Sequence, residues 1–425
     1  MLSIQKRLSN IFYIILGLPS TAMGFALSIQ IAVLSWILRT KYNLEIDQIG
    51  IVWAAGPIAG ILGQPIIGLI SDKAWFWGGR RKPFIIIGGI LAALMIFALP
   101  NIDRISNFFG IASIMAVAVT VALTLDLAIN ISFNPTRSII ADVTPDGQPR
   151  TKGYTWMQSI SNLCGSGAYL MGALIGNYFL IYAGVVIVLV FSIGPLFFIE
   201  EPRVLSAGSD DKDVKGKTDK AAASPTQWVE LFKLYFAHGF SWLGIQTMFV
   251  YMFAFLEQKL PAMNDMSVTD RNARLGQMIG WSFFILNAVG AIWPAFMLEP
   301  MSKKLGRVRT HAMMVAIMAL GYFGIVMFAS SAIMLYAMMC VLTLGWAAVV
   351  SLPFAIMSEK VDKSRMGFFM GIFNLSVVLP QLIASSVVGT VIKNSADKGI
   401  IFIISGVSLA ISAGLWLFVS EKKKI

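Results

Sequence analysis

The stretch Ala118-Val-Thr-Val-Ala-Leu-Thr-Leu-Asp126-Leu-Ala-Ile-Asn130-Ile-Ser-Phe-Asn134-Pro135-Thr-Arg137 is apolar except for a few widely spaced polar side chains. It belongs to a longer apolar run, 110–140, which at roughly 1.5 Å per helical residue can cross the about 30 Å of hydrocarbon in a bilayer. Asp126 stands alone in the middle of this run. A carboxylate at that depth is costly and persists mainly where it carries protons, ions or substrate, so the stretch predicts a membrane helix of a transport protein.

The polar residues of this stretch are spaced so that they share one side of the helix. Asn130, Asn134 and Arg137 follow Asp126 at i+4, i+8 and i+11. At roughly 100° per residue, these offsets keep all four within about 80° of one another. One polar stripe on an otherwise apolar helix indicates that this side faces a water-filled cavity.

The whole chain has the composition of a membrane protein. Hydrophobic residues make up 57% of it and charged residues 13%, against roughly 25% charged residues in ordinary globular domains. Apolar runs repeat from one end of the chain to the other, and each is long enough to span a bilayer as a helix. We interpret twelve of them as transmembrane helices: 9–38, 48–70, 83–101, 110–140, 155–177, 180–199, 228–256, 275–298, 310–329, 332–357, 366–391 and 399–420.

The basic residues predict the orientation of these helices. With both termini placed in the cytoplasm, 24 of the 33 Lys and Arg residues fall in inward segments and 8 in outward segments, while Arg137 lies within a span. This inward excess is what the positive-inside rule requires. The net charge of +11 is therefore explained by topology and by anionic inner-leaflet lipid, and we expect no nucleic-acid partner.

The sequence contains no motif for catalysis or metal binding. Cys164 and Cys340 lie in predicted spans without CxxC spacing, which favours simple packing over a disulfide or a metal site. The chain also has no nucleophile–base pair, Gly-rich phosphate loop or metal cluster. We therefore expect neither enzyme activity nor a cofactor, and we expect a monomer.

The chain divides into two similar parts. The hydrophilic segment 201–227 is too polar to bury and predicts a cytoplasmic linker between a six-helix bundle at 1–200 and a second one at 228–425. A basic loop follows the second helix of each part, Gly79-Arg80-Arg81-Lys82 in the first and Gly306-Arg307 in the second, 227 residues apart. The pattern predicts an all-α membrane protein with twelve transmembrane helices in two six-helix halves. This arrangement resembles the major facilitator superfamily, whose substrate site lies at the midplane between the halves.

Several stretches in both halves carry more specific motifs. They are Gly24-Phe-Ala-Leu-Ser-Ile-Gln30, Trp53-Ala-Ala-Gly56-Pro57-Ile-Ala-Gly60-Ile-Leu-Gly-Gln64-Pro65-Ile-Ile-Gly68-Leu-Ile-Ser71-Asp72, Gly79-Arg-Arg-Lys-Pro-Phe84, Leu125-Asp126-Leu-Ala-Ile-Asn130, Pro135-Thr-Arg137-Ser-Ile-Ile-Ala-Asp142 and Gly367-Phe-Phe-Met-Gly371-Ile-Phe-Asn374-Leu-Ser-Val-Val-Leu-Pro380-Gln381. These motifs resemble the sucrose-transporter group of proton symporters, which belongs with the glycoside–pentoside–hexuronide cation symporters. The resemblance is most specific in residues 24–142.

The resemblance implies transport of sucrose, maltose or a related glucoside together with protons. It implies that Asp126 is the proton-coupling carboxylate, and Arg137 matches the group's fourth-helix arginine. The seventh helix keeps Trp242 but is otherwise a looser match, which leaves the particular sugar open. The short loops are more similar to bacterial members, so we expect a multi-pass protein of a bacterial inner membrane with both termini in the cytoplasm.

The chemistry of Asp126 itself also favours proton coupling. A buried carboxyl group loses hydration, which favours its protonated form, and the protonated form can donate a hydrogen bond to a sugar hydroxyl. Proton and sugar then promote each other's binding, which is the minimum that symport requires. One intramembrane carboxylate suits one proton better than a sodium ion, which needs several oxygen ligands. Arg137 lies about 16 Å further along the helix, so we expect it to pair with Asp142 or to reach the inner mouth.

A sugar site needs amides for hydroxyl groups and an aromatic surface for C–H faces. Trp242, Gln246 and Phe249 share a helix face at i, i+4 and i+7 and offer such a wall. Intramembrane amides also join helices to one another, and we prefer that interpretation for Asn287 and Asn374. The candidate substrate-binding residues are Gln30, Gln64, Asn130, Asn134, Trp242, Gln246 and Gln381.

The loop after the second helix supplies a candidate cytoplasmic gate, formed by Asp72, Arg80, Arg81 and Lys82. The sequence thus predicts a proton-coupled symporter that imports a glucoside disaccharide of the sucrose or maltose class by alternating access, with the sugar and the bilayer as its partners. A proton-driven antiporter that exports a drug or metabolite is the main alternative, and it predicts a cavity of aromatics and Met instead of paired amides. A non-transporting sugar sensor is a further alternative. It would usually carry a long cytoplasmic tail, whereas this sequence continues for five residues beyond Ser420.

Overall fold

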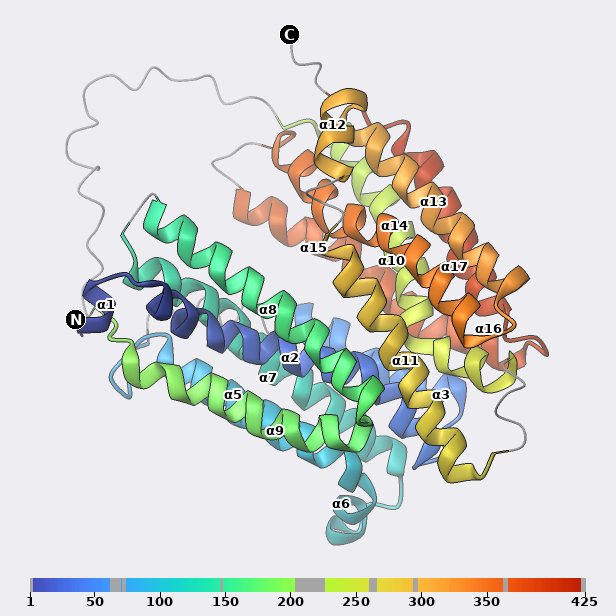
Figure 1. Cartoon of the computed structure of the whole chain (residues 1–425), viewed down its shortest axis with the longest axis horizontal. Helices are drawn as coiled ribbons and strands as arrows, with labels where there is room; N and C mark the ends of the chain where they lie inside the picture. The colour runs from blue at the N-terminus through green and yellow to red at the C-terminus, as the bar shows by residue number, and fades with distance from the viewer. Residues whose placement is uncertain are drawn as a thin grey trace.

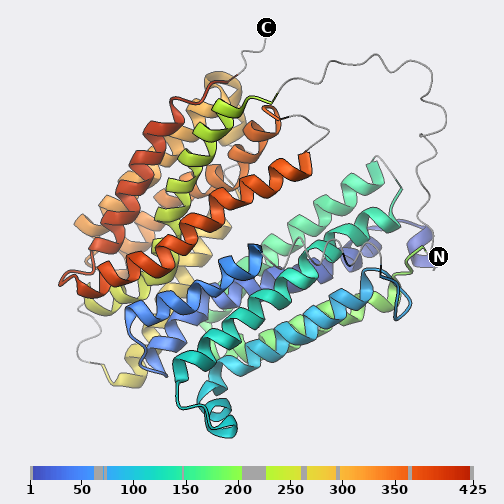
Figure 2. The same cartoon turned by 180° about the vertical axis from the view of Figure 1, so that it is seen from behind.

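The computed structural model describes residues 3–61, 70, 74–145, 148–202, 226–259, 266–292, 297–361 and 366–421. Every regular element among them is helical, apart from one isolated bridge between Phe76 and Gly79. The helices form two bundles, which meet at one end of the molecule and diverge toward the end that holds both termini (Figure 1, Figure 2).

The first bundle precedes the predicted linker. Its α3 (Ile46–Trp53) continues past a bend at Ala54, so that the apolar helix reaches Ile61. The other elements are α1 (Ser3–Lys6), α2 (Asn10–Thr40), α5 (Lys82–Ala98), the 3₁₀ turn η1 (Leu99–Asn101), α6 (Ile102–Phe109), α7 (Ile114–Val143), α8 (Gln148–Leu174), α9 (Asn177–Ile193) and the 3₁₀ turn η2 (Gly194–Phe198).

The second bundle has the same general plan. Its penultimate membrane segment is interrupted by a π-helical stretch, η6 (Ala384–Val388), between α15 (Met366–Ile383) and α16 (Gly389–Asn394). The other elements are α10 (Trp228–Lys259), α11 (Val268–Gly290), α12 (Glu299–Leu305), α13 (Arg307–Phe328), α14 (Ala332–Ser358) and α17 (Ile400–Trp416).

The predicted twelve-helix architecture is confirmed. Eight helical segments of the described residues are long and apolar enough to cross a membrane, and Ile46–Ile61 and Ile400–Trp416 are shorter apolar helices. The remaining two, α8 and α11, are more polar, and they pack against each other where the two bundles meet. The linker segment 203–225 lies outside the described residues, so the boundaries of the halves at 200 and 228 stay a prediction.

Local chemistry sets where several of these helices begin and end. The hydroxyl of Ser9 accepts a hydrogen bond from the Phe12 amide at the start of α2, and Ser113 caps α7 through the Ala116 amide. These caps satisfy amides that have no partner in the first helical turn. Gly110 ends α6 with a φ of 66°, a left-handed conformation that glycine adopts without strain.

Large apolar side chains cover the outside of both bundles. Leu94, Val186, Leu320 and Val350 are each more than half exposed, although they lie within helices. In water this surface would be unstable, whereas in a bilayer such side chains contact lipid. The outward face of the helices is therefore a lipid face, and polar side chains are left to the interior.

The two bundles share an apolar core only at the end where they meet. Glycine allows the closest contacts there: a Cβ on Gly280 would lie 2.9 Å from the Tyr169 carbonyl oxygen, and one on Gly50 would lie 2.1 Å from that of Ser385. At the end that holds the termini, each bundle has a separate apolar cluster. The clusters include Phe12, Ile139 and Met157 in the first bundle and Leu234, Met357 and Phe369 in the second.

Candidate functional site

Asp126 lies in the interior of the first bundle, half-way along α7. Its side chain is 8% exposed, and Gln30 of α2, which is 2% exposed, donates a hydrogen bond from Nε2 to Asp126 Oδ2 at 2.9 Å. A Cβ on Gly56 would lie 3.2 Å from the same oxygen, so the glycine allows the carboxyl group to rest on the helix that continues α3. Among the described residues Asp126 forms no ion pair, which leaves its charge to an amide alone.

The polar stripe of α7 runs from this carboxyl group toward the end of the bundle that holds the N-terminus (Figure 1). Asn130 donates from Nδ2 to the Asp126 carbonyl oxygen at 2.8 Å and is 8% exposed. Asn134 is half-buried and Arg137 is exposed. Exposure therefore increases along the stripe from Asp126 to Arg137, as expected for a helix that lines a cavity open at the end near Arg137.

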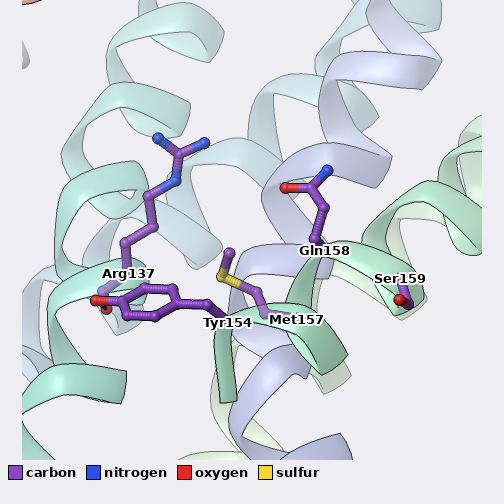
Figure 3. Close-up of a pocket in the computed structure, with 5 residues that line it drawn as sticks. All are labelled: Arg137, Tyr154, Met157, Gln158 and Ser159. Carbon is purple, nitrogen blue, oxygen red and sulfur yellow. Dashed lines mark hydrogen bonds between the residues drawn. The ribbon is translucent and has the colours of Figure 1, made fainter. Parts of the chain in front are cut away.

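Arg137 lines a pocket of about 580 Å³ between α7 and α8, together with Tyr154, Met157, Gln158 and Ser159. Arg137 and Gln158 extend to the same side of this pocket, with Met157 between them (Figure 3). The Arg137 guanidinium lies 4.1 Å from the centre of the Phe133 ring, a cation–π contact, and Tyr154 donates to the Arg137 carbonyl oxygen at 3.1 Å.

The predicted pairing of Arg137 with Asp142 is wrong. Asp142 instead forms a buried ion pair with Arg81, whose Nε lies 3.1 Å from Asp142 Oδ2. Asp142 lies five positions after Arg137, which places the two about 140° apart around α7. The two side chains therefore lie on different sides of the helix, and only Asp142 faces the start of α5.

The predicted cytoplasmic gate is bound within the first bundle. Glu201 accepts hydrogen bonds from the backbone amides of Arg80, Arg81 and Lys82, each at 2.8 Å. Together with the Arg81–Asp142 pair, this carboxylate joins the start of α5 to the ends of η2 and α7. Asp72, the fourth predicted gate residue, lies outside the described residues, as does Gln64.

The second bundle repeats this arrangement. Glu421 accepts hydrogen bonds from the Arg307 and Val308 amides at 3.0 and 3.2 Å, and Arg307 also pairs with Glu359 at the end of α14. The internal repeat inferred from two Gly-Arg pairs therefore extends to their acidic partners. Sequence reasoning missed Glu201 and Glu421, although each follows directly after the sixth helix of its half.

The candidate residues of the second bundle come together on α10, α14 and α15. Gln381 donates from Nε2 to Gln246 Oε1 at 3.2 Å, so the two predicted amides bind each other. Trp346 lies next to both aromatic members of the predicted wall, with ring centres 6.1 Å from Trp242 and 5.5 Å from Phe249. Sequence reasoning missed Trp346, because its partners lie on another helix.

This wall continues across to the first bundle. The Phe249 ring lies 5.3 Å from Phe283 of α11, which in turn lies 5.7 Å from Tyr169 of α8. We call the five side chains Trp242, Trp346, Phe249, Phe283 and Tyr169 the aromatic row. Phe249, Phe283 and Tyr169 lie in the core, whereas Trp242 and Trp346 are half-buried, so these two indoles are the part of the row that a ligand could contact.

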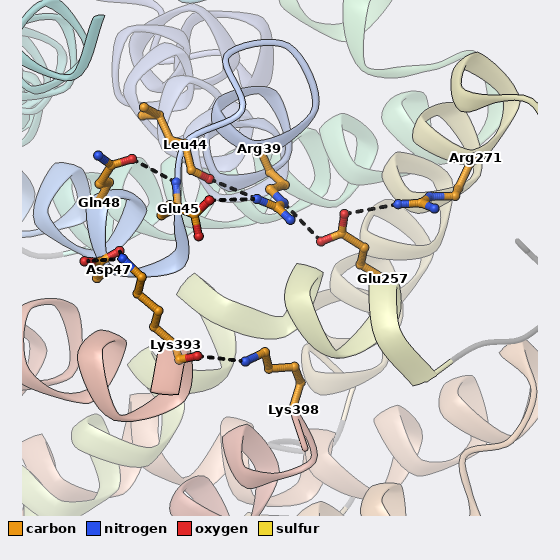
Figure 4. Close-up of polar contacts among 9 residues, drawn as sticks. All are labelled: Arg39, Leu44, Glu45, Asp47, Gln48, Glu257, Arg271, Lys393 and Lys398. Atoms are coloured by element: carbon orange, nitrogen blue, oxygen red, sulfur yellow. Dashed lines mark hydrogen bonds and ion pairs between the residues drawn. The ribbon is translucent and has the colours of Figure 1, made fainter. Parts of the chain in front are cut away.

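Ion pairs connect helices at the end of the molecule that lies opposite the chain termini (Figure 4). Glu257 at the end of α10 binds Arg39 of α2 at 3.1 Å and Arg271 of α11 at 3.3 Å. Asp47 of α3 binds Lys393 of α16 at 3.1 Å. The first and last of these pairs join the two bundles, and none was predicted from the sequence.

The comparisons with known proteins agree with this architecture. A family model described as Major Facilitator Superfamily matches residues 18–385. The chain is 22% identical over 431 residues to sucrose transport protein SUC4 of Arabidopsis thaliana, covering 88% of this chain and 82% of that protein. It is 29% identical over 178 residues to the general alpha-glucoside permease of Schizosaccharomyces pombe, covering 37% and 32%.

Two solved structures share the fold over nearly the whole chain. The nucleoside transporter NupG has a TM-score of 0.72 at 12% identity and covers 97% of this chain and 100% of its own. The D-xylose-proton symporter has a TM-score of 0.71 at 16% identity and covers 98% and 99%. With two helical bundles, apolar outer faces and a family model that spans most of its length, the chain belongs to the major facilitator superfamily of multi-pass membrane transporters.

Proposed function

We propose that this protein imports a glucoside disaccharide of the sucrose or maltose class together with protons, by alternating access. The observation that carries the proposal is the buried carboxyl group of Asp126, which is held by Gln30 and which no cation among the described residues neutralises. An acid buried in this way within a membrane is costly unless it exchanges a proton. The names of two relatives, a sucrose transport protein and an alpha-glucoside permease, support the substrate class.

Gln30 supports coupling between the proton and the sugar. Its Nε2 donates to the Asp126 carboxylate, while its Oε1 is buried and has no hydrogen-bond partner among the described atoms. The unpartnered Gln30 oxygen is available to accept a hydrogen bond from a sugar hydroxyl. The strength of the hydrogen bond from Gln30 Nε2 depends on the charge of the Asp126 carboxyl group. When Asp126 binds a proton, its hydroxyl becomes a donor, so the same cluster offers the sugar a different set of hydrogen bonds.

The second bundle supports the sugar contacts. A pyranose ring has apolar C–H faces and a rim of hydroxyls, which match the aromatic row and the neighbouring amides. A sugar bound here would stack on Trp242 or Trp346 and exchange the Gln246–Gln381 bond for bonds to its own hydroxyls. Its hydroxyls would also reach toward Gln30 and Asn130 across the midplane, as in other members of this fold class.

The contacts between the bundles support alternating access. The pairs Arg39–Glu257 and Asp47–Lys393 hold the outer end closed, whereas the exposed Arg137 marks the inner end. We take this conformation as the one that releases sugar and proton to the cytoplasm, along the stripe of Asn130, Asn134 and Arg137. The excess of basic residues in inward segments supports cytoplasmic termini, and we propose a monomer in the cell inner membrane.

The test is sugar-driven alkalinisation of weakly buffered, de-energised cells. Sucrose, maltose and trehalose are compared for the wild type, Asp126→Asn and the control Asp103→Asn, whose carboxylate pairs with Lys41 outside the spans. We expect alkalinisation with one of these sugars, its loss in Asp126→Asn and its retention in Asp103→Asn. The absence of any pH change despite confirmed membrane expression would overturn symport, and proton release on adding the substrate would identify an antiporter.

A further inference from the structure

We propose that His238 is a positioning residue: its Nε2 atom fixes the indole of Trp242, so that Trp242 presents its ring face to the substrate. This inference rests on the proposed function, because it concerns the aromatic surface on which the sugar would stack. His238 and Trp242 lie four residues apart on α10, one helical turn, and Trp242 Nε1 lies 2.9 Å from His238 Nε2.

The chemistry of the two groups leaves one assignment for this bond. An indole N–H only donates, so His238 Nε2 must accept through its lone pair. The imidazole is therefore neutral, with its hydrogen on Nδ1. The bond occupies the indole N–H, and Trp242 consequently has an aromatic face, and no donor, to offer a ligand.

The imidazole is itself held in place. It is 2% exposed and stacks on Phe373 of α15, with ring centres 4.9 Å apart and an interplanar angle of 15°. Its Nδ1 is buried without a hydrogen-bond partner among the described atoms. The Phe373 stack and the Trp242 bond thus set the orientation of the ring, and a buried ring of this kind acts on a ligand only through Trp242.

Helix α15 contacts α10 next to both candidate substrate-binding residues of α10, Trp242 and Gln246. Phe373 holds His238, and Gln381, eight residues further along α15, holds Gln246. The helices approach closely between these points, since a Cβ on Gly239 would lie 3.2 Å from Pro380. We infer that α15 orients the aromatic face through His238 and the amide through Gln381.

The experiment separates the effect of the Trp242–His238 hydrogen bond from the effect of the ring stacking between His238 and Phe373. His238→Phe keeps a ring for Phe373 and removes the acceptor. His238→Gln places an oxygen near the position of Nε2, whereas His238→Asn places one nearer the backbone, out of reach of Trp242. His311→Phe is the control, since His311 is equally buried and its ring contact is with Trp416 at 4.3 Å.

Two readouts are measured on the full chain in proteoliposomes. The first is KM and Vmax for proton-driven uptake of the sugar that the alkalinisation assay identifies. We expect His238→Phe and His238→Asn to raise KM roughly fivefold with little change in Vmax, as for the loss of one hydrogen bond. We expect His238→Gln to restore KM, His311→Phe to leave it unchanged, and His238→Phe to add nothing to Trp242→Phe.

The second readout needs no sugar. It is the indole N–H resonance of Trp242, identified by its absence in Trp242→Phe, which should shift in His238→Phe and return in His238→Gln. If the wild type moves no disaccharide, the proposed function fails, and this resonance alone decides whether His238 orients Trp242. The positioning role would be overturned by an unshifted resonance. It would also be overturned if His238→Phe raised KM by the same factor in the wild type and in the Trp242→Phe variant. Should His238→Phe fail to fold, the contrast between His238→Gln and His238→Asn gives the same decision.

Discussion

Arg39 of the first bundle donates a hydrogen bond from Nε to Glu257 Oε2 of the second bundle at 3.1 Å, and the other carboxylate oxygen binds Arg271 at 3.3 Å. One acid therefore joins α2, α10 and α11 at the end of the molecule opposite the chain termini. In the proposed alternating access, opening of this end separates α2 from α10 and breaks the Arg39–Glu257 pair. The pair contributes to the equilibrium between the two states more than to the stability of either bundle.

Glu257→Gln should shift the protein toward the outward-open state. The partly exposed Arg39–Glu257 pair contributes at most about 1 kcal/mol, which changes the ratio of states up to about fivefold. The measurement is the distribution of distances between spin labels at Asn43 and Thr269, with Cys164 and Cys340 replaced. The control is Lys259→Gln, because Lys259 pairs with Asp397 inside the second bundle. Equal distributions for wild type and Glu257→Gln would contradict the role of this acid as an outer gate.

Gln30→Ala should impair coupling through Asp126. Gln30 is the one described side chain that donates to this carboxyl group, and a hydrogen bond to a charged group contributes roughly 1.5–3 kcal/mol. We expect proton-coupled uptake to fall about tenfold, and we expect Gln30→Ala to have no further effect in an Asp126→Asn background.

Asn287→Ala is the matched control for that experiment. Asn287 is another amide within a span, but it donates to the Phe283 carbonyl oxygen of its own helix. Uptake by Asn287→Ala should stay near the wild-type level. Additive losses from Gln30→Ala and Asp126→Asn would show that the two side chains act separately.

The parts of this molecule that sequence predicts are those that depend on one helix at a time. Apolar runs and the basic loops predict the twelve helices and the repeat, because the bilayer imposes both constraints locally. The functional importance of Asp126 is also predictable, since the free-energy cost of its carboxylate arises from its depth in the bilayer alone. The side chains that contact these residues cannot be predicted in this way. Periodicity indicates which residues share one side of a helix, but it does not indicate which other helix packs against that side.

The outcome for Arg137 illustrates this limit. Its distance from Asp126 follows from helix rise, and its contact with Phe133 is an i, i+4 pair within α7. The ion pair between Asp142 and Arg81, in contrast, depends on how α5 packs on α7. In the same way, Gln246 and Gln381 are separately recognisable as intramembrane amides, and only the structure places one against the other.

Glu421→Gln should reduce stability in a pH-dependent way. Burial raises the pKa of Glu421, but hydrogen bonds from the Arg307 and Val308 amides outweigh this, so the pKa lies below its usual 4.5. The contribution of this carboxylate is therefore fully present above about pH 4.5 and is lost as the pH falls through its lower value in the folded protein.

The measurement is the Tm of the purified protein in detergent at pH 7 and at pH 4. We expect Glu421→Gln to lower Tm at pH 7 and to have less effect at the lower pH. The loss of stability at pH 7 should stay below about 1 kcal/mol, because the site is partly exposed to solvent. A loss of the same size at both pH values would mean that the carboxylate charge is not what stabilises the start of α13.

Trp346→Leu should weaken sugar binding. Trp346 contacts both Trp242 and Phe249, and each aromatic pair contributes roughly 0.5–1.5 kcal/mol beyond burial of its area. We expect KM for sugar uptake to rise about tenfold with a smaller change in Vmax. Trp281→Leu is the control, because Trp281 packs on Phe284 of its own helix. A fall in Vmax with unchanged KM would place Trp346 in the conformational step and not in the binding surface.

Arg137→Lys should show whether the guanidinium acts through its charge or through its shape. Lysine keeps the charge at the inner end of the α7 stripe but cannot stack as a plane on Phe133, whose ring centre lies 4.1 Å from the Arg137 guanidinium. If the stacked geometry matters, Arg137→Lys and Phe133→Leu should each slow uptake several-fold, and the double variant should be no slower than Arg137→Lys. If charge alone matters, Arg137→Lys should transport normally while Arg137→Gln fails. Initial rates of proton-coupled sugar uptake in proteoliposomes distinguish the two outcomes, because they are measured before any gradient dissipates.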